Sequence, residues 1–178
     1  MHNVVISGTG LYTPPFSISN DELVESFNTY VRHFNDQHAE AIAKGEMEAL
    51  SESSSAFIEK ASGIKSRFVV NKEGILDPQR MTPRIPERSN EDWGILCEMA
   101  VHAAKQALER AGRTPADIDG VIVACSNLQR AYPAVAIEVQ AALGIQGFGF
   151  DMNVACSSAT FGIQAAVNSV QLGQARAI

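Results

Sequence analysis

The sequence predicts an α/β fold, and two stretches carry this prediction. Gly120 to Cys125 is a continuous apolar run typical of a strand buried in a parallel sheet, and residues 148–154 alternate in size with the period of a strand. Between them, Pro133 stands where a helix would start, and an apolar stripe runs on to Gly144. Strand, helix and strand therefore follow one another as a right-handed crossover unit. The second strand ends at an edge where α/β proteins build their sites.

Composition limits the classes of protein to which the chain can belong. At 178 residues, 46% hydrophobic and 19% charged, it is an ordinary globular sequence with room for one real core. A net charge of −6 argues against a nucleic-acid-binding protein. No signal peptide and no run of membrane-spanning length are visible, so we expect a soluble, cytoplasmic protein. Cys97, Cys125 and Cys156 lie too far apart for a metal-binding pair, and an odd number is a poor disulfide framework.

Cys156 is the candidate nucleophile, because a predicted strand turns into a predicted helix at this residue. Apolar residues fill positions 159–172 almost without a polar face, so we expect a helix buried nearly all round, with Cys156 in its first turn. Free N–H groups and the positive end of the helix dipole favour a thiolate there, and the same N–H groups can stabilise an oxyanion. The alternative is a buried cysteine acting as a small apolar residue. Spacing alone leaves both interpretations open.

The N-terminal part of the chain predicts a buried strand at Val4 to Ile6 and then a tight turn at Gly8-Thr9-Gly10. Ser19 to Glu22 fits a capping box, and apolar residues continue at helical spacing toward Gly45. We therefore expect a long amphipathic helix here.

The middle of the chain predicts two further helices. Residues 56–61 form a short helix ended by Gly63, and a strand follows at 64–70. The proline-rich stretch 77–86 should be an extended loop. A second capped helix opens at Ser89 to Asp92 and closes at Gly112.

Four short segments that occur in one order along the chain carry a family resemblance: Ile6 to Pro14, Ser62 to Arg67, Ala131 to Ala134 and Asp151 to Gly162. Together they resemble the N-terminal half of a 3-oxoacyl-ACP synthase III, a ketoacyl synthase of the thiolase superfamily. The resemblance implies a thiolase-like layered α/β/α fold with a mixed sheet and a buried nucleophile helix, of which residues 1–178 would be the first half. The resembled proteins are shorter in one region, so we expect a helical insertion at about residues 21–55.

The resemblance also implies an activity in fatty acid biosynthesis. The cysteine matching Cys156 takes an acyl group from acyl-CoA, and malonyl-ACP then adds to it by decarboxylative Claisen condensation, with no cofactor beyond these substrates. A histidine and an asparagine from the C-terminal half assist, and no histidine follows Cys156. We therefore expect a fragment, or one part of a two-chain assembly. The insertion and three residues that differ from the resembled proteins, Phe57, Ala61 and Tyr132, all fall near the expected substrate entry. They favour a primer longer than acetyl.

Three more residues are candidate substrate contacts by resemblance. Phe57 occupies the position of a tryptophan that stacks on the CoA adenine, whereas Ala61 replaces the arginine beside it. Arg67 belongs to a basic middle region that could steer anionic CoA and carrier protein. The cations of this region are Lys60, Lys65, Arg67, Lys72, Arg80, Arg84 and Arg88. Tyr132 replaces a phenylalanine in a turn that reaches over the partner's acyl tunnel, which implies a homodimer. The alternatives are a core position for Phe57, a solvated surface for the charges and a simple exposed turn for Tyr132.

Other functions remain open at this stage. The chain could be another thiolase-superfamily condensing enzyme, of quinolone, polyketide or hydroxymethylglutaryl-CoA type. It could also be a non-catalytic partner that binds acyl carriers. A thiol hydrolase or redox sensor is less well supported, because the Cys156 segment lacks the flanking glycines of a hydrolase elbow and no second cysteine is close in sequence.

Overall fold

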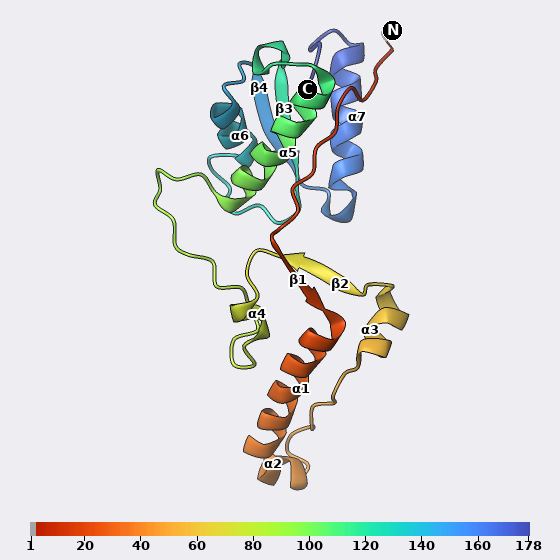
Figure 1. Ribbon diagram of the computed structural model, residues 1–178, viewed down its shortest axis with the longest axis vertical. Helices are drawn as coiled ribbons and strands as arrows, with labels where there is room; N and C mark the ends of the chain where they lie inside the picture. Colours follow the sequence, from red (N-terminus) through yellow and green to blue (C-terminus); the bar gives the residue numbers. More distant parts are fainter. Residues whose placement is uncertain (1–2) are drawn as a thin grey trace. The chain divides into compact units, whose positions relative to one another are not determined.

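The computed structural model describes residues 3–178, which form two compact units. The first unit combines the chain up to Tyr12 with Arg88–Ile178, and the second is Thr13–Glu87. Each contains a two-stranded sheet packed with helices (Figure 1). The predicted α/β class is therefore confirmed. The strands form one parallel and one antiparallel pair in separate sheets, where a single mixed sheet was expected.

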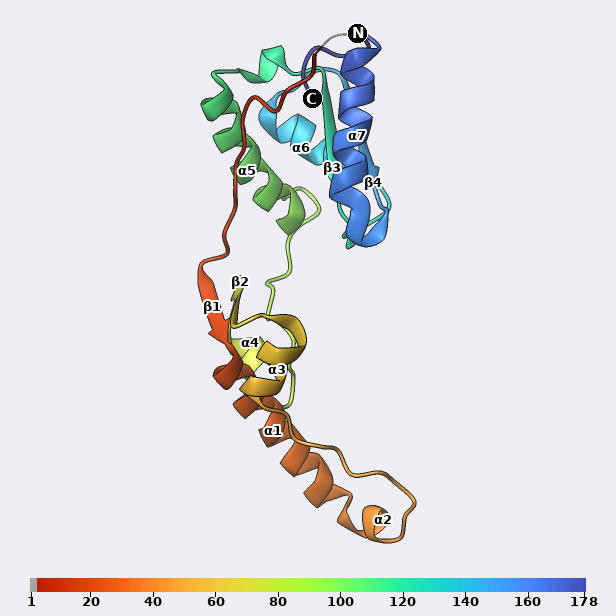
Figure 2. The same cartoon turned by 90° about the vertical axis from the view of Figure 1, so that its right-hand side faces the viewer.

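In the first unit, strand β3 (Gly120–Ala124) runs parallel to β4 (Phe148–Met152). Helix α6 (Val135–Leu143) connects them, which confirms the strand, helix and strand order. Helices α5 (Ile95–Ala111) and α6 cover one face of the sheet, and α7 (Ser158–Gln171) covers the other (Figures 1 and 2). The sheet is thus the middle layer of three.

The core of this unit lies between the sheet and the α5–α6 face. Cys97 and Val101 of α5 and Val135 and Val139 of α6 are buried together, and Val121 of β3 packs against them. Side chains alternate between the two faces of a sheet along a strand, so the residues of β3 on either side of Val121 in sequence face α7 instead. A Cβ placed on Gly162 of α7 would lie 3.0 Å from the Cβ of Ala124, which shows how closely α7 approaches β3.

Two expectations about burial in this unit are wrong. Residues 4–6 form no strand, and Val5 is 76% exposed. Helix α7 buries only Ser158 and Gly162, while Phe161 and Ile163 are more than half exposed. The physical reason is shared: within the described residues β3 pairs with a strand on one side only, so the sheet is too narrow to cover either element. An apolar groove of about 460 Å³ borders β3, α5 and α7.

The Gly-x-Gly segment packs against a helix, and this explains its composition better than a tight turn. A Cβ on Gly10 would lie 1.8 Å from the carbonyl oxygen of Ala103, so no larger residue fits beside α5. The side chain of Gln106 accepts from the N–H of Leu11 and donates to the Leu11 carbonyl, at 3.3 and 3.0 Å. Glycine is therefore required here for close approach.

Helix α5 also begins later than predicted. The residues expected to cap it form a separate turn, in which the Ser89 N–H donates to the Asp92 carboxylate at 3.1 Å. The helix itself starts at Ile95 and ends, as predicted, at a left-handed Gly112. A polar cluster that suits a helix start suits a short turn equally well.

In the second unit, β1 (Phe16–Ser19) pairs antiparallel with β2 (Ser66–Val69). The predicted capping box is confirmed at the start of α1 (Asn20–Gln37), but the expected long helix is interrupted at His38 and continues as α2 (Ala39–Ala43). Helix α3 (Ser55–Ser62) ends at Gly63 in the left-handed conformation, as predicted. A further short helix, α4 (Glu73–Leu76), precedes the proline-rich loop.

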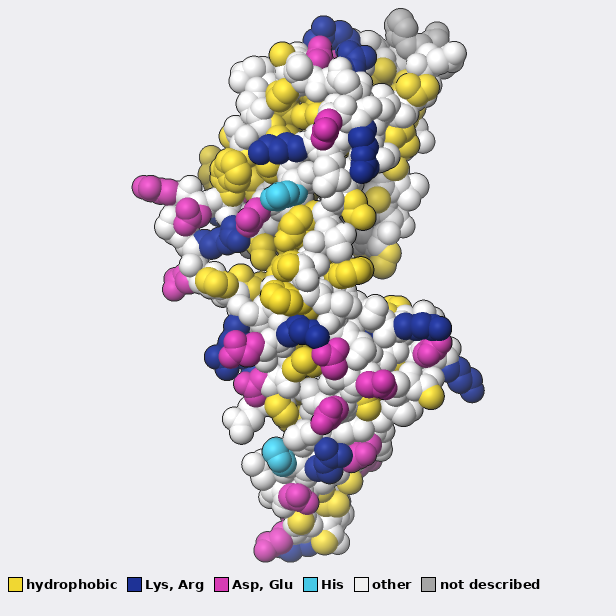
Figure 3. Space-filling view, in the orientation of Figure 1, with side chains coloured by type: hydrophobic (Ala, Val, Ile, Leu, Met, Phe, Trp, Pro, Cys, Tyr) yellow, Lys and Arg dark blue, Asp and Glu magenta, His cyan; other side chains and the backbone are white. Residues whose placement is uncertain are grey.

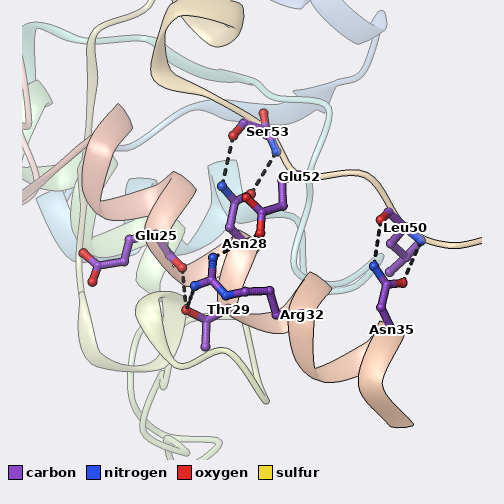
Figure 4. Close-up of polar contacts among 8 residues, drawn as sticks. All are labelled: Glu25, Asn28, Thr29, Arg32, Asn35, Leu50, Glu52 and Ser53. Carbon is purple, nitrogen blue, oxygen red and sulfur yellow. Dashed lines mark hydrogen bonds and ion pairs between the residues drawn. The ribbon is translucent and has the colours of Figure 1, made fainter. Parts of the chain in front are cut away.

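Two asparagines on α1 hold the chain that returns from α2 (Figure 4). Asn28 donates to the Ser53 carbonyl and accepts from the Ser53 N–H, at 3.0 and 2.8 Å. Asn35 makes the same pair of bonds with Leu50, both at 2.9 Å. Each side-chain amide thus donates and accepts as a backbone peptide group would. The backbone N–H and C=O groups of Ser53 and Leu50 therefore have hydrogen-bond partners without a neighbouring strand.

We predict that Glu22 makes the second unit sensitive to acid. The Lys72 ammonium, 2.6 Å away, and the Ser19 N–H and hydroxyl lower the pKa of Glu22 from 4.5 to about 2. A lowered pKa stabilises the folded state above the unfolded value of 4.5, and this stability is lost as pH falls toward 2. Glu22→Gln should therefore flatten the pH dependence of the unfolding free energy between these values. Identical pH profiles for the two proteins, measured by urea unfolding, would contradict the prediction.

Candidate active site

Cys156 lies in a single 3-10 turn, Ala155–Ser157, between β4 and α7. Its side chain is exposed, so it does not act as a buried apolar residue. The residue also differs slightly from the predicted position, because α7 begins at Ser158 and Cys156 precedes the helix instead of lying in its first turn. The sulfur is therefore accessible at the amino end of a helix of 14 residues.

The backbone of this turn is strained and is held by hydrogen bonds. Ala155 has φ +45°, which a residue with a side chain rarely adopts. Ser158, only 4% exposed, accepts from the Val154 N–H at 2.9 Å and donates to the Ala155 carbonyl at 2.8 Å. The Asn153 side chain accepts from the Ala155 N–H at 3.1 Å. Such strain persists only where the surroundings impose it, and it is commonly found at functional sites.

The role of Ser158 in this turn was not predicted from the sequence. A signal was present, because serine is favoured at helix starts, where its hydroxyl can bond to nearby backbone groups. Two serines follow Cys156, however, and the sequence does not distinguish the buried Ser158 from Ser157.

Tyr132 lies in the loop of residues 126–134, which leaves the carboxyl end of β3. Its side chain is 88% exposed. Because β3 and β4 are parallel neighbours, this loop and the Cys156 turn leave the sheet at the same edge. Helix α6 begins two residues after Pro133, at Val135, and not at the proline itself.

Phe57 and Arg67, the other predicted contacts, belong to the second unit. Phe57 is 65% exposed on α3, so it is not a core residue. The Nη2 of Arg67 donates to Asn20 at 2.9 Å, which ties β2 to the first residue of α1. Arg67 Nη1 is buried and has no hydrogen-bond partner among residues 3–178.

The basic middle region is largely neutralised by acidic neighbours. Ion pairs involve four of its cations: Lys65 with Glu59, Lys72 with Glu22, Arg84 with Asp77 and Arg88 with Glu98. On the face of the second unit drawn in Figure 3, basic and acidic side chains are mixed. The predicted positive patch is therefore not a field of one sign, and the alternative of a solvated, mixed surface describes it better.

The remaining cysteines differ in their surroundings. Burial raises the pKa of Cys97 to about 11, so its thiol stays protonated in the core. Cys125 follows β3, and its sulfur accepts from the Asn127 N–H at 3.4 Å.

Across the described part of the chain, no cluster of three or more His, Cys, Asp or Glu side chains is arranged to hold a metal ion. None of the helices within residues 3–178 combines the length and apolar character needed to cross a bilayer.

Curated proteins with similar sequences are named as acyl-carrier-protein synthases. The chain is 82% identical over 155 residues to a β-ketodecanoyl-[acyl-carrier-protein] synthase of Pseudomonas aeruginosa, a match that covers 87% of this chain and 44% of the relative. It is 30% identical over 179 residues to a β-ketoacyl-[acyl-carrier-protein] synthase III of Granulibacter bethesdensis, covering all of this chain and 42% of the relative. The chain therefore spans less than half the length of these relatives. No family model matches it.

Solved structures share the fold. A 3-oxoacyl-[acyl-carrier-protein] synthase III from Aquifex aeolicus superposes with a TM-score of 0.65 at 24% identity, over 96% of this chain and 41% of that one. The priming β-ketosynthase of the R1128 polyketide pathway gives a TM-score of 0.60 at 26% identity, over 93% and 36%. The predicted thiolase-like fold class is confirmed by these neighbours.

We predict that Ser158→Ala destabilises the first unit by about 0.5–1.5 kcal/mol, because it removes the hydrogen bonds that the buried Ser158 hydroxyl makes with the Val154 N–H and the Ala155 carbonyl. Ser157→Ala is the matched control, since Ser157 is exposed and its hydroxyl makes no hydrogen bond with any of residues 3–178. Urea unfolding of both variants measures the difference. Equal losses in the two variants would show that the Ser158 hydroxyl does not hold the turn.

Proposed function

The chain is homologous to part of the β-ketoacyl-[acyl-carrier-protein] synthase III proteins, and on this premise we propose that it is the acyl-accepting part of an acyl-CoA-primed ketoacyl synthase of fatty acid biosynthesis. The observation that carries the proposal is the exposed thiol of Cys156 on a strained turn at the amino end of α7. We propose this sulfur as the nucleophile.

The proposed first step is acyl transfer. The Cys156 thiolate attacks the carbonyl carbon of the acyl-CoA thioester, and CoA leaves as a thiolate once the tetrahedral intermediate collapses. Backbone N–H groups at the start of α7 supply positive potential near the oxyanion. The small side chains of Ala155, Ser157 and Ala159 leave the sulfur open to a substrate.

The proposed second step is condensation with malonyl-ACP. Loss of CO₂ from the malonyl group provides the carbanion, which attacks the acyl-Cys156 carbonyl and releases the cysteine thiolate with a 3-oxoacyl-ACP. The family resemblance assigns assistance in this step to a histidine and an asparagine that lie outside these 178 residues. Acyl-CoA, acyl carrier protein and a second copy of the protein are thus the proposed partners, in the cytoplasm, with no cofactor.

The proposed primer is an octanoyl thioester. The 82% identical Pseudomonas aeruginosa relative is named for a β-ketodecanoyl product. Because a malonyl extender contributes two carbons, a decanoyl-length product requires an octanoyl primer. This supports the expectation of a primer longer than acetyl. A second candidate is the priming of a polyketide, which the R1128 ketosynthase favours through its shared fold and 26% identity.

We predict that octanoyl-CoA acylates Cys156 of this chain. Intact-mass analysis should show one octanoyl adduct, and peptide mapping should place it on Cys156. Cys156→Ala should abolish the adduct, whereas Cys125→Ala should retain it. An adduct that persists in Cys156→Ala, or none on the unmodified chain, would refute the proposed function.

We also predict that octanoyl-CoA acylates Cys156 more efficiently than acetyl-CoA. Burial of each methylene contributes about 0.8 kcal/mol, so even two buried methylenes give roughly a tenfold preference. Initial rates measured at several concentrations of each thioester provide the ratio. A preference for acetyl-CoA would exclude the longer primer while leaving the role of Cys156 intact.

A further inference from the structure

Asp151 of β4 makes two hydrogen bonds to the start of a different element. Its Oδ2 accepts from the Val135 N–H and its Oδ1 from the Ala136 N–H, both at 2.8 Å. These are the first two residues of α6, whose own N-cap residue, Ala134, has no side-chain acceptor. The strand therefore supplies the cap that the local sequence lacks.

The two bonds are strong for their type. A carboxylate that accepts from N–H groups makes charge-assisted bonds, and the N-terminus of a helix favours a negative charge. They fix the point at which the loop of residues 126–134 becomes helix. Within the loop, on the amino-terminal side of Tyr132, Gln129 accepts from the Leu96 N–H of α5 at 3.3 Å, and Arg130 pairs with Glu138 of α6.

The loop is therefore held at both flanks while its tip, Tyr132, is exposed. Asp151 lies in the same strand-and-turn segment as Cys156, and the loop leaves the neighbouring strand at the same edge. One carboxylate thus links the position of the loop to that of the nucleophile.

We propose that Asp151 is a positioning residue that sets the loop of residues 126–134 relative to Cys156, and that this loop forms part of the surface that binds the acyl thioester. The inference rests on the proposed function and adds a residue to it. Asp151 acts through the loop and does not touch the reacting atoms. Ser158 and Asn153 hold the Cys156 turn separately.

Asp151→Asn tests this, because it keeps the size of the side chain but replaces one acceptor oxygen with an NH₂ group facing an N–H donor. We expect the half-saturating octanoyl-CoA concentration for Cys156 acylation to rise roughly tenfold, the effect of losing one hydrogen bond to a charged group. Alkylation of Cys156 by iodoacetamide should stay within about twofold, because this small reagent needs no loop.

Asp119→Asn is the matched control. Asp119 adjoins the amino end of β3, and its carboxylate accepts from Arg176 Nη2 at 2.8 Å and from Arg176 Nε at 3.1 Å. The Asp119→Asn variant therefore loses comparable hydrogen bonds at the opposite end of the same sheet. We expect no change in the half-saturating octanoyl-CoA concentration. Equal increases in both variants, or an equal fall in alkylation and acylation for Asp151→Asn, would overturn the proposal.

A second measurement separates this inference from the proposed function. Trypsin cleavage after Arg130 reports the loop without any acyl-CoA, and circular dichroism confirms that each variant is folded. We expect cleavage to be faster in Asp151→Asn than in Asp119→Asn. Equal cleavage rates would refute the positioning role. Faster cleavage together with no acylation of the unmodified chain would instead support the link to the loop and refute the synthase.

Discussion

The parallel pairing of β3 with β4 is the constraint on which the candidate site depends. Parallel strands bring their carboxyl ends to one edge, so the loop after β3 and the turn after β4 become neighbours although they are separated by a helix in sequence. Helices packed on both faces hold the pair, with the core valines toward α5 and α6 and with Ile122 and Ala124 close to Gly162 of α7. A shift in this register would move Cys156 away from the loop.

The Cys156 turn shows how local strain is maintained at such an edge. Ala155 adopts a positive φ that is unfavourable for alanine, and the buried hydroxyl of Ser158 bonds to backbone groups on both sides of it. Cys156 in this turn is exposed, whereas Cys97, buried in the same unit, remains a protonated core residue. Two cysteines of one chain thus differ in exposure because their surroundings differ.

Local sequence signals predicted local structure well. The capping box at Ser19, the left-handed glycines at Gly63 and Gly112 and the strand beginning at Gly120 are all confirmed. Each depends on bonds within a few residues or on an apolar run that needs no particular partner. The predictions failed where a neighbour had to be present. Val5 is apolar but has no adjacent strand, and α7 is apolar on faces that nothing in the described chain covers.

The sequence by itself determined that a cysteine follows a strand and precedes an apolar helix, and its motifs carried a resemblance to synthase III proteins that the similarity to curated relatives confirms. Only the tertiary structure decided that this cysteine is exposed, that Ser158 and not Ser157 holds its turn, and that Asp151 caps α6 from another element. The physical reason is that hydrogen bonds between elements depend on how strands and helices pack in three dimensions. Residue spacing along the chain does not contain that information.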